Sequence, residues 1–216
     1  MKLSIVSLLL FGFLTFVVAG AVEPEATPKP AEVAWRPLFD GKTLAGWKST
    51  NYGGEGEVAV EEGCVVLNIG SSLTGITYQK KDLPTNNYEV RCEAKRADGR
   101  DFFCGMTFPV VNSHCSLIVG GWGGAIVGLS SINGHDASEN ETTKYMKFEE
   151  NRWYKFRVRV TPNRIEAWID EQPVIDADIK GCKVSTRNEV TLNQPLGFAS
   201  YETKAVLRNI EVREVK

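Results

Sequence analysis

The residues best suited to sugar chemistry lie within 153–170, where polar and apolar side chains alternate. The polar side of this stretch carries Arg157, Arg159, Glu166 and Trp168. Cross-strand neighbours on one sheet face lie about 5 Å apart, so these groups can meet. A ring can stack on a sugar while charged groups bind its hydroxyls. The pattern therefore predicts a carbohydrate site, with Glu166 and Arg157 as catalytic groups and Trp168 and Arg159 as binding groups. The alternative is a solvated face with a cross-strand ion pair.

A second polar segment, residues 130–143, reads as one long loop. Loops of this length in a compact domain are either functional or disordered. We predict that Asp136 adds a second catalytic carboxylate, and that His135, Glu139 and Asn140 bind the ligand. A mobile surface loop remains the alternative. The carboxylates of this segment are candidate ligands for a structural calcium ion, although the regular spacing of a calcium-binding loop is absent. No other cofactor is expected.

The glycine-rich stretch 120–124 surrounds Trp122 with four glycines. Such a stretch is more typical of a tight bend or strand crossing than of a phosphate-binding loop, and no helix follows it. Trp122 is placed among the ligand-binding residues. The sequence gives no support for a nucleotide site.

Composition excludes several functions. The chain has 25 Lys and Arg against 27 Asp and Glu, for a net charge of −2, so it gives no electrostatic support for nucleic acid or an anionic membrane surface as partner. With two histidines and no paired-cysteine motif, no metal site is predicted. Proton chemistry must rest mainly on carboxylates, with His114 and His135 as the available imidazoles. A catalytic cysteine is not supported, because no His-containing nucleophile pattern lies nearby.

The elements that must position these groups read as β-strands. Residues 88–95, 153–160 and 164–170 alternate strictly between apolar and polar, and the turn at 162–163 predicts a hairpin. Further strands are expected at 58–60, 64–69, 75–79, 102–108, 114–119, 125–129, 173–176, 196–201 and 206–212. After residue 21, no long segment shows the 3.6-residue apolar period of an amphipathic helix. The sequence predicts an all-β sandwich of two antiparallel sheets.

The chain is expected to have three parts. Residues 1–21 are predicted to be a secretory signal cleaved after Ala21, with an uncleaved anchor as alternative. Residues 22–33 are predicted to be a Pro-rich tether and residues 34–216 the folded domain. The protein is therefore expected to be secreted or periplasmic, with no other membrane association. The odd count of five cysteines leaves at least one thiol free, and a disulfide cannot be paired from sequence.

Several motifs carry a family likeness. The segment Pro37-Leu-Phe-Asp-Gly-Lys-Thr-Leu-Ala-Gly-Trp47 resembles the opening motif of the 3-keto-disaccharide hydrolase domain family. Residues 151–160 with 163–170 resemble its paired late strands, and residues 196–199 with 207–212 its closing strands. The resemblance implies a concanavalin A-like jelly roll and hydrolysis of 3-keto-glycosides.

The middle of the chain departs from that family. Members commonly carry an Asn-Ser-Gly-rich strand and then a strand whose Glu points at the site. This chain has 101–108 and 114–122 in those places, and the acidic residue of the second strand is missing. No catalytic residue is transferred from the family for this reason. The absence weighs against catalysis more than against the fold.

The sequence leaves three hypotheses for the function of this protein. The first is a secreted hydrolase for 3-keto-disaccharides or related glycans, in which a base removes the proton beside the keto group, the aglycone leaves and water adds afterwards. The second is a lectin-like carbohydrate-binding module without catalysis. The third is a structural or protein-interaction domain. The substrate and the oligomeric state stay open.

Overall fold

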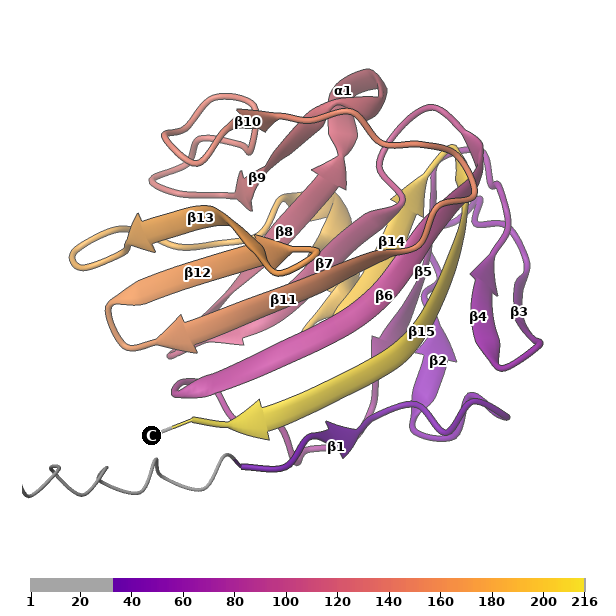
Figure 1. The fold of residues 1–216 in the computed structure, drawn as a ribbon, viewed down its shortest axis with the longest axis horizontal. Coiled ribbons are helices and arrows are strands. Elements are labelled where there is room, and N and C mark those ends of the chain that lie inside the picture. Colours follow the sequence, from indigo (N-terminus) through magenta and orange to yellow (C-terminus); the bar gives the residue numbers. More distant parts are fainter. Residues whose placement is uncertain (1–32, 216) are drawn as a thin grey trace, which may run out of the picture. The chain divides into compact units, whose positions relative to one another are not determined.

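The computed structural model describes residues 33–215. The predicted signal and nearly all of the predicted tether lie outside these residues. The predicted fold class is confirmed, since two antiparallel sheets pack face to face as a jelly-roll sandwich. Figure 1 shows β11, β6 and β15 crossing in front of β8, β7 and β14. No helix within 33–215 has the length and apolar character to cross a bilayer.

One layer, sheet A, has eight strands. In spatial order they are β13 (Gln172–Asp178), β12 (Arg164–Ile169), β11 (Tyr154–Thr161), β6 (Tyr88–Gly99), β15 (Thr203–Glu214), β4 (Cys64–Leu67) and β3 (Val58–Glu61), with β1 (Arg36–Pro37) paired to β15. The predicted hairpin is confirmed, because Arg157 pairs with Trp168 and Arg159 with Glu166.

The other layer, sheet B, has seven strands. Their spatial order is β10 (Lys144–Tyr145), β9 (Ile126–Ser130), β8 (Ser113–Gly120), β7 (Cys104–Val110), β14 (Gly197–Tyr201), β5 (Leu73–Tyr78) and β2 (Trp47–Ser49). A four-residue turn, α1 (Gly121–Gly124), in which Trp122 and Gly123 have positive φ, follows β8, and a 3₁₀ helix, η1 (Asn188–Asn193), precedes β14. The predicted bend at 120–124 is confirmed by α1.

The core lies between the two sheets and explains the alternation. On β11, Phe156 and Val158 are buried in it, whereas Arg157 and Arg159 point away. On β7, Met106 belongs to the same core. Each sheet therefore has an inner face toward the core and an outer face away from it.

The outer face of sheet B is itself covered. The loop that follows β9 and the helix η1 lie on it, and Ala137 and Val190 each pack in a small apolar cluster separate from the main core. Gly128 allows this approach, because a side chain there would begin 2.7 Å from the Ala137 carbonyl oxygen. Residues such as Thr107 and Ser116 are consequently buried although they point outward.

The five cysteines are all free thiols. Cys92 of sheet A and Cys104 of sheet B face each other across the core, with their Sγ atoms 3.9 Å apart. This is the pair that one disulfide would join.

Candidate functional site

The polar cluster predicted on β11 and β12 forms on the outer face of sheet A. The Arg157 guanidinium lies 3.8 Å from the centre of the Trp168 ring. A guanidinium nitrogen of Arg159 lies 3.7 Å from a carboxylate oxygen of Glu166. The four predicted residues are therefore neighbours, as the strand alternation indicated.

Glu89 of β6 changes what this cluster can do. Its side chain is fully buried and accepts hydrogen bonds from Arg157 at 2.8 Å, Arg159 at 2.8 Å and Arg213 at 2.7 Å. The arginines predicted to hold a sugar thus bind an internal carboxylate, and one of them covers the Trp168 ring. This arrangement favours the ion-paired face over a ligand site. The catalytic roles of Glu166 and Arg157 stay predictions.

The loop 130–143 is held by hydrogen bonds rather than left free. The Asn140 side-chain amide donates to the backbone carbonyls of Leu129, His135 and Asp136 at 2.8, 3.0 and 2.8 Å. Its amide group is therefore engaged with the loop itself. His135 and Glu139 are exposed.

Asp136 is engaged by two partners near the outer face of sheet B. It accepts hydrogen bonds from the Ser131 hydroxyl at 3.0 Å and from Arg187 at 2.5 Å. Arg187 immediately precedes η1, on the outer face of sheet B. Asp136 and Glu166 thus belong to the outer faces of opposite sheets, and within residues 33–215 no hydrogen bond or ion pair joins these two carboxylates to a common partner. Their joint catalytic role stays a prediction.

The structure places a pocket of about 640 Å³ elsewhere, at the end of sheet B where β8 begins. Strand and loop residues from four parts of the chain line it. They are Lys48, Tyr78, Gln79, Lys80, Lys81, Leu83, Thr85, Pro109, Val111, Asn112, Ser113, His114, Gln194 and Pro195.

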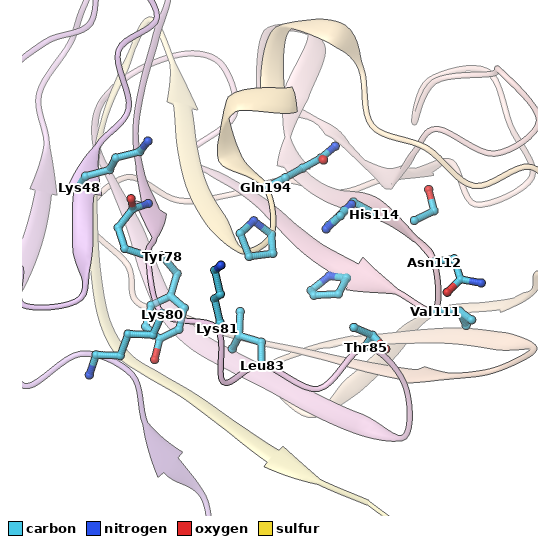
Figure 2. A pocket seen from close by; sticks show the side chains of 14 residues that line it. Lys48, Tyr78, Lys80, Lys81, Leu83, Thr85, Val111, Asn112, His114 and Gln194 are labelled. Atoms are coloured by element: carbon cyan, nitrogen blue, oxygen red, sulfur yellow. The ribbon is translucent and has the colours of Figure 1, made fainter.

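The sheet register brings these distant residues together. His114 of β8 lies opposite Pro109 of β7, and Lys48 of β2 lies opposite Thr77 of β5. The two loops on one side are joined where the Val111 amide donates to the Thr85 carbonyl at 2.7 Å. In Figure 2, Lys48 and His114 stand on opposite sides of the pocket, with Lys81 between them in this view.

The charged side chains that line this pocket are all basic. Lys48, Lys80 and Lys81 form no ion pair with any residue of 33–215, and none of the lining side chains is a carboxylate. Three cations without counter-ions create a positive potential that favours an anion or a negative charge formed during a reaction.

His114 is the one imidazole in the pocket lining. Its ring is half-buried, and burial lowers its pKa below 6.5. The imidazole is therefore mainly neutral at pH 7. Within 33–215 it makes no hydrogen bond or ion pair, so a ring nitrogen is available to accept a proton. A neutral base beside cations suits proton removal with formation of an enolate.

The described residues do not suggest a metal centre. No group of three or more His, Cys, Asp or Glu side chains within 33–215 could hold an ion. The acidic residues of the loop 130–143, which were candidate calcium ligands, form no such group within 33–215.

The sequence contained one signal for this pocket, because His114 was one of two imidazoles. Its lysines gave none, since Lys48 and Lys81 are ordinary among 25 basic residues until the sheet order brings them beside β8.

The comparisons with known proteins agree with the sandwich. A family model described as 3-keto-alpha-glucoside-1,2-lyase-like domain matches residues 34–213, nearly all of the described part. This is the family whose motifs the sequence resembles. No curated protein matches the chain.

Solved structures show the same fold at low identity. The chain is similar to the carbohydrate binding module CBM66 from Bacillus subtilis, at 15% identity and a TM-score of 0.53, covering 78% of this chain and 96% of that one. It is similar to the laminarinase from Flavobacterium sp. UMI-01, at 16% identity and 0.53, covering 85% and 100%. The endo-beta-1,3(4)-glucanase SCLam matches at 11% identity and 0.53, covering 85% and 93%.

Proposed function

Because the chain belongs to the 3-keto-alpha-glucoside-1,2-lyase-like domain family, which associates it with carbohydrates, we propose that it cleaves 3-keto-glucosides by elimination in the pocket of His114. The observation that carries this proposal is the neutral imidazole among three unpaired lysines. Two carboxylates flanking the bond, which ordinary glycoside hydrolysis requires, are absent from the lining.

The chemistry follows from the keto group. A ketone at C3 makes the C2 proton acidic, and the His114 imidazole accepts that proton while the electron pair moves onto the C3 oxygen. The ammonium groups of Lys48 and Lys81 stabilise this enolate. The enolate then re-forms the ketone and the C1–C2 double bond while the C1–O bond breaks, and the departing oxygen takes a proton from the imidazolium. Later addition of water across the double bond would give net hydrolysis.

The test is turnover of 3-keto-trehalose in deuterated water, followed by NMR for exchange at C2 and for release of the aglycone. His114→Gln is expected to lower both rates by roughly a hundredfold, as for loss of a general base. Lys81→Met is expected to lower them as well. Lys155→Met, an exposed lysine on sheet A, is the matched control and leaves them unchanged.

One further variant separates this proposal from the sequence-based one. If Glu166 were the base, Glu166→Gln would abolish turnover and His114→Gln would not. The pocket proposal expects the reverse. Full activity of His114→Gln would overturn it.

A binding module is the second candidate. The missing carboxylates favour it as well, because the pocket would then hold an anionic or keto sugar without reaction. Saturable binding of 3-keto-trehalose with no C2 exchange at any pH would support this function and contradict the lyase.

Export is proposed alongside either function. It rests on the apolar segment 1–21 with small residues at its end. N-terminal sequencing of protein recovered outside the cytoplasm is expected to begin at Val22. Recovery with residues 1–21 still attached would contradict cleavage.

A further inference from the structure

Trp122 is presented to solvent by a strained and rigid turn. It has φ 50° and ψ 56°, a left-handed conformation that costs free energy for a bulky residue, yet its side chain is 43% exposed. The turn is fixed, because the Gly123 amide donates to Asp101 Oδ2 at 2.8 Å. The fold thus holds an indole outward without the compensation of burial.

A second exposed aromatic ring is joined to residues 101–102, the segment that also fixes the turn of Trp122. Tyr201 of β14 is 37% exposed, and its ring lies 6.1 Å from that of Phe102 at an angle of 30°. The Tyr201 amide donates to the Phe102 carbonyl at 3.1 Å. Residues 101–102 therefore fix the turn of Trp122 on one side and Tyr201 on the other.

Polar groups adjoin the Trp122 ring. The Arg187 guanidinium lies 6.0 Å from the centre of the Trp122 ring and is paired with Asp136 at 2.5 Å and Glu189 at 2.9 Å. These groups are partly exposed and held in place by one another. One guanidinium against two carboxylates makes this surface neutral to acidic, which opposes an anionic ligand and accepts an uncharged polyol.

We infer that Trp122, Tyr201 and Arg187 form a second carbohydrate-binding surface, which binds uncharged gluco-oligosaccharides. Exposed rings stack on the apolar faces of hexoses, and fixed charged groups hydrogen-bond the hydroxyls. The inference rests on the proposed carbohydrate function but not on the elimination chemistry.

This surface is separate from the pocket of His114. Gly120 ends β8 six residues after His114, roughly 20 Å along the strand, and α1 begins there. In Figure 1, α1 lies at the end of β8, next to β9. The two sites also differ in charge, since the pocket is cationic. A bound glucan chain would therefore hold the protein near its substrate without filling the pocket.

The experiment is calorimetric titration of the protein with maltotetraose, cellotetraose and laminaritetraose, together with NMR of the indole N–H signals. At least one of the three is expected to bind and to shift the Trp122 signal. Trp122→Gly is expected to weaken binding about tenfold or more, as for loss of a central aromatic contact. Glycine adopts this positive φ without steric cost, so the substitution adds no backbone strain at the turn.

Three controls make the outcome decisive. Tyr145→Ala removes a ring that is 78% exposed on β10 and is expected to leave binding unchanged. His114→Gln is expected to lose turnover and keep binding. Because the ligand is uncharged, about 0.5 M salt is expected to leave the affinity unchanged.

Binding of none of the three oligosaccharides, or equal binding by Trp122→Gly, would overturn the inference and leave the lyase proposal standing. Loss of binding in His114→Gln would also overturn it, because the oligosaccharide would then occupy the pocket.

Discussion

The Glu89 carboxylate is fully buried and surrounded by guanidinium groups. Burial by itself would raise its pKa, but hydrogen bonds from Arg213 and Arg159 and the charges of Arg159 and Arg157 outweigh burial and lower it. A carboxyl whose pKa is lowered on folding adds stability above its unfolded pKa, and that stability is lost as the pH falls through the folded value. Acid unfolding is therefore expected to involve Glu89.

Replacing this carboxylate tests its role. Glu89→Gln removes the charge of the fully buried carboxylate that Arg157, Arg159 and Arg213 share, and is expected to lower the free energy of unfolding by roughly 3–5 kcal/mol. Urea denaturation measures the loss. Glu166→Gln is the control, because its pair with Arg159 is longer and partly exposed, and a loss under about 1 kcal/mol is expected. Equal losses in the two variants would contradict a special role for Glu89.

His114 makes a second prediction at the level of one residue. Since burial lowers its pKa below 6.5, the neutral base persists into mildly acidic solution. The acid limb of kcat/KM is expected to lie below pH 6.5 and to be absent from the residual activity of His114→Gln. A limb above pH 6.5 would assign the titration to another group.

Among the elements, η1 depends on one buried amide. Asn193 Nδ2 donates to the Ile76 carbonyl at 3.1 Å and to the Thr50 hydroxyl at 3.3 Å, and its Oδ1 accepts from the Tyr52 hydroxyl. Gln194, the next residue, lines the pocket. The amide thus connects the position of the pocket wall to β2 and β5.

Asn193→Leu removes these bonds at nearly constant volume. It leaves buried polar partners unsatisfied, so a loss of roughly 1–3 kcal/mol in urea denaturation is expected, with weaker turnover in the pocket. Asn188→Leu, an exposed residue of the same helix, is the control and is expected to change neither. Unchanged stability in Asn193→Leu would show that η1 is held by other contacts.

The strands could be predicted from sequence wherever one face is polar. β11 and β12 agree with the predicted strands to within one residue, and β6 begins at the predicted residue 88 but continues four residues beyond residue 95. On β7 and β8 both faces are buried, so an apolar run indicates a strand without showing which side carries the site. The helix η1 and the two-residue β10 have no periodic signal. The long β15 was predicted only from residue 206, because residues 203–205 carry no alternation.

The candidate sites required the sheet order, which the sequence does not contain. Glu89 alternates with apolar residues like any surface carboxylate, and its burial depends on Arg213, 124 residues away. Lys48 and His114 share a pocket because β5, β14 and β7 lie between their strands. The four residues of the β11–β12 hairpin were predictable as neighbours because their contact is local.

For the whole molecule, thiol reactivity reports on the integrity of the sandwich. Burial raises the pKa of Cys92 well above its usual value and that of Cys115 to about 12, whereas Cys182 is partly exposed. A native protein treated with Ellman's reagent is expected to show one fast thiol, which Cys182→Ser removes.

Unfolding in guanidinium should then expose all five thiols. A count lower by two would show that one disulfide had formed, and Cys92 with Cys104, whose Sγ atoms lie 3.9 Å apart, is the expected pair. Several fast thiols in the native protein would contradict the packing of the core.

The two segments that cover the outer face of sheet B are residues 131–143 and 187–194. Val190 and Ala137 pack in their own small clusters and not in the main core. Regions with separate packing open by themselves at a lower free energy than global unfolding. Hydrogen exchange in 131–143 and 187–194 should therefore proceed while the amides of β6 and β7 stay protected. For the same reason, substitutions of the exposed residues in these two segments can alter what the protein binds without a matching loss of the sandwich, so ligand preference and fold stability can evolve independently there.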